Sequence, residues 1–145
     1  MSDSGWNGRP GGLAPKSGRR SGVRNLSDLR PLVRIGRYRL GSHAIKHAAS
    51  EGFTESDVVN TVLYGRELAR YWEDERLLVL GHIPASPTVK IPLHVVLEYS
   101  RPRWVDIVTA FIPLVPHKVV SRARLAEILR YDRHAARRTI IGPRR

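Results

Sequence analysis

Two histidines lie four residues apart in a segment that favours a helix. Ser42 suits the N-cap of a helix over residues 43–50, and Gly52 follows as a residue that ends helices. Residues four apart share one helix face, so His43 and His47 lie together. Imidazoles titrate near neutral pH and suit general acid or base catalysis. Either the pair moves protons, or both are solvent-facing histidines without a role.

The histidine pair does not form a metal motif. The intervening Ala44, Ile45 and Lys46 leave out the glutamate of a zinc-protease helix. The chain has no cysteine, which excludes disulfides, thiolate chemistry and zinc sites built on cysteine. It also has no glycine-rich phosphate loop, nucleophile elbow or dinucleotide fingerprint. We therefore expect no metal and no cofactor.

A β-hairpin is predicted for residues 93–111, because β-prone apolar residues alternate on both sides of a proline turn. If the strands pair symmetrically about that turn, Thr109 lies on the apolar face under the helices. The opposite, mixed face then carries His94, Glu98 and Asp106. These three are either a second catalytic cluster or ordinary exposed strand residues.

The elements that must position these residues are helices and strands in a simple order. After the first helix, Thr54 and Asp57 form a variant capping box for a second one. Strands follow over residues 68–72 and 76–83 and then the hairpin, and Ser121 begins a last helix. This order predicts an α+β fold with two N-terminal helices, a mostly antiparallel four-stranded sheet and a C-terminal basic helix. We expect the helices on one face of the sheet and the mixed face open.

Length and composition predict one domain with tails. The chain has 145 residues, of which 41% are hydrophobic, enough for one modest core. We expect residues 1–32 to be a disordered basic tail, residues 33–138 to form the domain, and residues 139–145 to be a basic tail. No apolar segment approaches the length of a membrane span, and the polar start lacks a signal peptide. A cytoplasmic protein without membrane contact is therefore predicted.

The net charge of +12 is concentrated at the two ends of the chain. Residues 1–39 and residues 118–145 each carry +7, whereas residues 40–117 carry −2. Such ends favour contact with a polyanion, RNA or DNA, unless they only keep the protein soluble. Arg130, Arg133 and Arg137 are spaced to form a column on the last helix. The candidate nucleic-acid-binding residues are Lys118, Arg122, Arg130, Arg133, Arg137 and Arg138.

Four segments within about residues 40–113 resemble a known bacterial family. They are SHAIKHAASEGFTESDVVNTVLYG, DERLLVLG, PLHVVLEY and DIVTAF, and they resemble domain of unknown function family 4258. The resemblance implies a small α+β fold similar to that of RelE-type and BrnT-type toxin ribonucleases. His43 matches the histidine that begins a helix in the family signature, and Thr109 matches its strand threonine. The family usually has an arginine in the first helical segment, where this chain has His47 and Glu51.

Two functions are open at this point. The first is a metal-independent endoribonuclease of toxin–antitoxin type, with an antitoxin as a further partner. Its candidate catalytic residues are His43 and His47 for proton transfer, Arg76 for phosphorane charge and Thr109 as a positioning hydroxyl. The second is a non-catalytic RNA-binding or ribosome-associated module, in which the basic ends hold phosphates. Both functions make RNA the expected partner.

Overall fold

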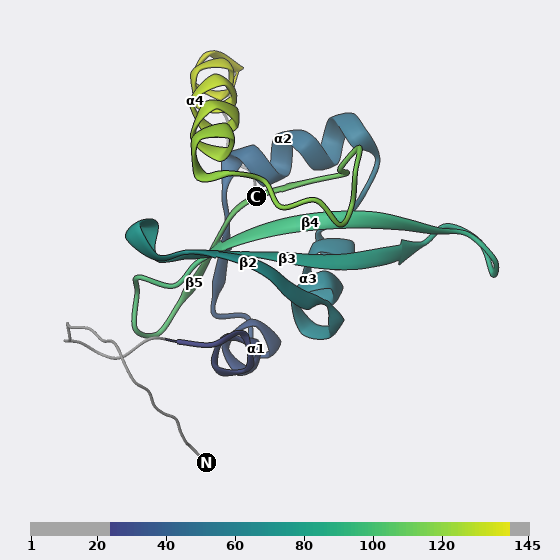
Figure 1. Cartoon of the computed structure of the whole chain (residues 1–145), viewed down its shortest axis with the longest axis horizontal. Coiled ribbons are helices and arrows are strands. Elements are labelled where there is room, and N and C mark those ends of the chain that lie inside the picture. Colours follow the sequence, from purple (N-terminus) through teal and green to yellow (C-terminus); the bar gives the residue numbers. More distant parts are fainter. Residues whose placement is uncertain (1–23, 140–145) are drawn as a thin grey trace.

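The computed structural model describes residues 24–139. Its strands form one five-stranded sheet in the order β1-β5-β4-β3-β2 (Figure 1). β1 is parallel to β5, and the other neighbouring strands are antiparallel. The α+β class is confirmed, but the sheet is mixed and has a fifth strand that we did not predict. The strands are β1 (Tyr38–Leu40), β2 (Arg66–Tyr71), β3 (Arg76–Pro84), β4 (Lys90–Glu98) and β5 (Val105–Phe111).

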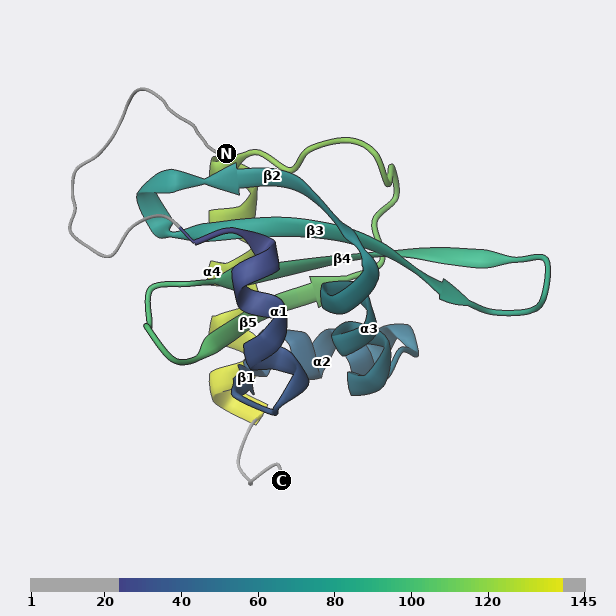
Figure 2. The ribbon, with the colours of Figure 1, turned by 90° about the horizontal axis from the view of Figure 1, so that it is seen from below.

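Helices cover both faces of this sheet. α1 (Leu26–Arg34) and α3 (Glu55–Tyr64) lie on one face, α4 (Arg122–Thr139) crosses the other, and α2 (Ser42–Glu51) lies beside β5 (Figure 2). Our expectations of two N-terminal helices and of one open face are therefore wrong: three helices precede β2, and α4 covers the second face. Within residues 24–139, no helix is both long and apolar enough to cross a membrane.

α1 is the helix that the sequence interpretation missed. Residues 24–32 were assigned to a disordered tail, yet nearly all of them belong to this helix or its cap. Asp28 Oδ2 accepts the backbone N–H of Asn25 at 2.9 Å, which satisfies a donor at the helix start. Spacings of three and four residues place the buried side chains on one helix face. They are Leu26, Leu29 and Val33.

α3 has the capping box predicted for it. Thr54 Oγ1 accepts the N–H of Asp57 at 3.1 Å, and Asp57 Oδ2 accepts the N–H of Thr54 at 2.9 Å. Gly65 caps the helix end, where a Cβ would lie 2.5 Å from the carbonyl oxygens of Leu80 and Thr61. Only glycine lets α3 end this close to β3.

Each face of the sheet has its own apolar core. Beneath α1 and α3, the larger core includes Leu29, Val62, Leu77, Val95 and Ile107. Beneath α4, the smaller core consists of Tyr71, Leu78, Val96, Leu125 and Leu129. The buried stripe that the sequence predicts for the last helix therefore exists, but it packs on the face that we expected to be exposed.

A β-bulge at Val108 changes which side chains share a face. The β4–β5 pairing follows the expected symmetry as far as Leu97 and Ile107. The next pair is Val96 with Thr109, so Val108 is an extra residue in β5. Thr109 therefore lies on the α4 face with Val96, and the prediction that it shares the apolar face of Leu97 and Ile107 is wrong. The bulge also puts Phe111 on the α4 face, where it pairs with His94.

Candidate functional site

α2 runs along β5 and is attached to it at both ends. The N–H of Gly41, which precedes α2, donates to Ile107 O at 2.9 Å. At the other end, Glu51 Oε1 accepts the N–H of Ile112 at 2.7 Å. His43, His47 and Glu51 are spaced four residues apart and lie along one face of the helix.

His47 and Glu51 form a close pair. His47 Nδ1 lies 2.7 Å from Glu51 Oε2, and the two side chains keep 20% and 28% of their surface exposed. His43, one turn earlier, is 8% exposed, so it is not the solvent-facing residue that we expected. The carboxylate orients the imidazole of His47 through Nδ1. Sequence reasoning missed this pairing, although an acid four residues after a helical histidine signals it.

Phe111 connects α2 to the sheet. Its ring centroid lies 6.2 Å from that of His47 and 5.4 Å from that of His94, edge-on to the latter. The bulge at Val108 makes this arrangement possible, because it places Phe111 on the same face as His94. Phe111 therefore packs near one imidazole from the helix and one from β4.

His94 is completely buried, and its hydrogen bond determines its tautomer. Its Nε2 lies 2.7 Å from Pro116 O, which can only accept, so Nε2 carries the proton and Nδ1 is an acceptor. Burial lowers the pKa of His94, while the hydrogen bond to Pro116 O raises it, and a charge on the nearby His117 would lower it further. The neutral form is favoured. Among the described residues, Nδ1 has no hydrogen-bond partner.

The cluster of His94, Glu98 and Asp106 does not form. The three share a sheet face, but both carboxylates are engaged elsewhere. Glu98 accepts a hydrogen bond from Arg76 at 3.0 Å, while Asp106 pairs with two cations. Those cations are Arg39, at 3.4 Å, and Arg101, at 3.3 Å. The alternative that these are ordinary strand residues therefore describes Glu98 and Asp106, whereas His94 is a core residue.

The four candidate catalytic residues are not brought together. Arg76 pairs with Glu98 on β4, whereas His47 packs near Phe111, which pairs with His94 on the same strand. Glu98 and His94 are four residues apart, or about 13 Å at the usual rise of a strand. Thr109 is 0% exposed, and its hydroxyl has no partner among the described residues. One substrate therefore cannot contact all four side chains at the same time. The structure leaves His47 as the one accessible member near Phe111.

The loop of residues 112–121 passes over this end of the sheet. It begins at the end of β5 and leads into α4, and three hydrogen bonds hold residues 116–120 against the sheet. They run from His94 Nε2 to Pro116 O (2.7 Å), from Arg66 to His117 Nδ1 (3.2 Å) and from the Tyr71 hydroxyl to Val120 O (2.6 Å). Several apolar side chains of the loop nevertheless face solvent, above all Leu114, which is 100% exposed.

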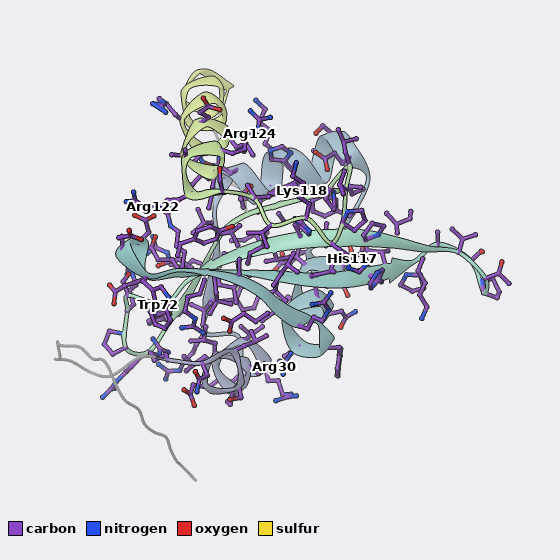
Figure 3. All side chains as sticks on the ribbon, viewed as in Figure 1. Arg30, Trp72, His117, Lys118, Arg122 and Arg124 are labelled. Atoms are coloured by element: carbon purple, nitrogen blue, oxygen red, sulfur yellow. The ribbon has the colours of Figure 1, made fainter. Side chains whose placement is uncertain are left out.

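A cavity of about 500 Å³ lies between this loop, the sheet and α4, and we call it the α4 pocket. His94 and Phe111 line it from the sheet, and Ile128 lines it from α4. Its charged lining residues are Lys118 and Arg124, and no Asp or Glu of residues 24–139 lines it. Figure 3 shows both cations above the sheet on the same side of α4. The pocket therefore combines apolar walls with a positive opening.

The predicted nucleic-acid-binding residues have different environments. Lys118 lines the α4 pocket, and Arg130 is exposed on α4. Arg122 instead donates to both carboxylate oxygens of Asp74, at 2.8 and 3.1 Å. This bond lowers the pKa of Asp74 and raises that of Arg122. The side chains of Arg133, Arg137 and Arg138 lie outside the described ones. Arg124 was missed, although it lies in the same basic helix.

The described residues contain no group of three or more His, Asp or Glu side chains placed to hold a metal ion. Comparison of the chain with protein-family models, with curated proteins and with solved structures finds no match. The likeness to family 4258 therefore stays a prediction, and the functional argument rests on the residues themselves.

Proposed function

We propose that the protein binds RNA through the loop of residues 112–121 and the first half of α4. The observation that carries the proposal is the α4 pocket, where the charged side chains that line it from the described part of the chain are both cations, Lys118 and Arg124. Phosphate contacts by such side chains supply most of the affinity for nucleic acid. The +7 charge of residues 118–145 gives the same region a field that attracts a polyanion.

The two cations are available to a ligand. Arg124 contacts Glu127 at 3.4 Å, but the side chains are 66% and 64% exposed, and an ion pair of this kind is weak. Lys118 is exposed. Arg122 differs from both because its guanidinium is already occupied by Asp74. We therefore assign to Arg124 the phosphate-binding role that was predicted for Arg122.

Binding of single-stranded RNA, measured by fluorescence anisotropy across a salt series, tests this proposal. The double variant Lys118→Ala/Arg124→Ala should bind weakly to every sequence, and its salt slope should be shallower by about 1.4, roughly 0.7 for each lost contact. The matched control is Lys90→Ala/Arg103→Ala, which removes two exposed cations, one at the start of β4 and one in the turn between β4 and β5. Equal losses in the two double variants would show that only net charge matters and would contradict the proposed site.

Metal-independent RNA cleavage of the toxin type is a second candidate, favoured by the His47–Glu51 pair. Phe111 contacts His47 and also lines the α4 pocket, so RNA bound there would pass close to this imidazole. In such a reaction His47 takes the proton of a ribose 2′ hydroxyl and the 2′ oxygen attacks phosphorus. The bond from phosphorus to the 5′ oxygen then breaks, and a proton passes to that oxygen. An antitoxin or the ribosome would be the partner of such an activity.

Cleavage of a mixed RNA pool in excess EDTA tests this second candidate. His47→Ala should lower the rate by about 10²–10⁴-fold, the usual contribution of a general acid or base. Glu51→Gln should have a smaller effect, and His82→Ala, which removes an exposed histidine of β3, should have none. No cleavage by the wild type, or full cleavage by His47→Ala, would leave binding as the function.

A further inference from the structure

We propose that the α4 pocket binds one unpaired ribonucleotide of an RNA strand, with its base inside and its phosphate at the opening. This inference rests on the proposed RNA binding and adds a selection for single strands. A base that is stacked and paired in a duplex is not available to enter a cavity. The pocket would therefore distinguish unpaired from paired RNA, which surface cations alone do not do.

The walls and size of the α4 pocket suit a base. Its volume of about 500 Å³ lies within the usual range for small-molecule sites, and apolar side chains dominate its lining. Phe111 provides an aromatic ring, and Val120 and Ile128 provide aliphatic surface. Aromatic and apolar side chains accept every base, because each base has a flat π face.

The opening of the α4 pocket suits a phosphate. Lys118 and Arg124 are its two cations, and both are exposed. The first turn of α4 also reaches the pocket, and its N-cap is Ser121, whose hydroxyl accepts the N–H of Arg124 at 3.0 Å. The positive end of an α-helix dipole favours an anion at this place.

His94 supplies the observation that selects a nucleotide over other apolar anions. It lines the pocket, is 0% exposed, and keeps Nδ1 as an acceptor without a partner among the described residues. A buried acceptor of this kind favours a ligand that brings a hydrogen-bond donor. Base amino and imino groups and ribose hydroxyls are such donors. A fatty-acid carboxylate has no such donor, and inorganic phosphate offers only its own P–OH group.

Titration of the full-length protein with nucleoside 5′-monophosphates, followed by calorimetry and by amide NMR shifts, tests the inference. The probes are AMP, CMP, GMP and UMP, with ribose 5-phosphate and inorganic phosphate as comparison ligands. At least one nucleotide should bind tenfold or more tightly than inorganic phosphate, with shifts at Lys118, Val120 and Arg124. Equal binding of phosphate and all nucleotides would reduce the pocket to an anion site and overturn the inference.

Three variants separate the parts of the site. Ile128→Trp fills the pocket from a partly exposed position and should abolish nucleotide binding. His94→Gln keeps a donor for Pro116 O but replaces the ring acceptor Nδ1 by an amide oxygen at another position, so it should weaken the preferred nucleotide and leave phosphate unaffected. Lys118→Ala should weaken both, and Lys90→Ala should change neither. Circular dichroism confirms that each variant is folded.

Failure of the inference differs from failure of the proposed function. Suppose that the wild type binds RNA and that Ile128→Trp binds single-stranded RNA with the same affinity and the same preference for single strands over duplex. The pocket then does not take a base, and the inference fails while the proposed function stands. If wild type binds no RNA at all, the proposed function itself fails.

Discussion

Thr109 has a hydroxyl group that the fold buries without a partner among the described residues. An unpaired buried hydroxyl costs free energy, so Thr109→Val, which keeps the shape, should raise the free energy of unfolding by roughly 1 kcal/mol. Thr61→Val is the matched control, because the Thr61 hydroxyl donates to Asp57 O at 3.0 Å, and its loss should cost about 1 kcal/mol. Urea unfolding measures both. Destabilisation by Thr109→Val would show that its hydroxyl has a stabilising partner.

His94 makes stability depend on pH. Burial lowers its pKa below the usual value of 6.5, so in the window between these two pKa values the unfolded chain binds more protons than the native protein. Stability should therefore fall as the pH is lowered from 6.5, by at most about 1.4 kcal/mol per pH unit from this residue. His94→Gln, measured by urea unfolding from pH 7.5 to 5, should show a smaller decrease. Parallel curves would exclude His94 as the cause.

At the residue scale, the sequence predicted the placement of side chains on α2 better than on the sheet. The helical spacing of His43 and His47 is confirmed, and Glu51 was detectable from its position. The α4 pocket was not predictable, because its lining comes from β4, β5, a loop and α4. Arg76 is a candidate for phosphorane charge by its residue type alone, and its pairing with Glu98 on the neighbouring strand is not visible in the sequence.

Among the elements, α3 and β3 approach so closely that a glycine is required between them. Gly65→Ala should lower the free energy of unfolding by roughly 3 kcal/mol, because the new Cβ would meet two backbone oxygens at 2.5 Å. Gly36→Ala is the control. It has open space but φ of +83°, so it should cost only about 1–2 kcal/mol of backbone strain. Thermal unfolding compares them, and equal losses would show that α3 moves easily.

Caps and alternation identified most elements, but they did not fix how the elements meet. The Thr54–Asp57 capping box and the first pairs of the β4–β5 hairpin follow from local chemistry. The bulge does not, because Val108 and Thr109 are both β-branched and alternation alone cannot locate an extra residue. Helical periodicity likewise revealed the buried stripe of α4 but not the face of the sheet on which it packs.

For the whole molecule, α1 contributes a part of the core that the fold needs. A chain that begins at residue 36 loses three buried apolar side chains, each worth about 1.5–3 kcal/mol, which is a large part of the stability of a typical domain. We expect it to be unfolded or insoluble. A chain that begins at residue 23 is the control, because it keeps α1 and the contact of Arg24 with Tyr99 O at 3.2 Å. Equal thermal stability of the two would contradict this role of α1.

The parallel pair of β1 and β5 sets the order in which the molecule can be assembled on the ribosome. β2, β3 and β4 are neighbours in sequence and in space, so they can pair soon after they are made. β1 leaves the ribosome first, yet Leu40 pairs with Ile107, so it has no strand partner until β5 is translated several seconds later, at roughly 5–20 residues per second. During that interval the face of α2 that packs on β5 is exposed to chaperones and to other nascent chains.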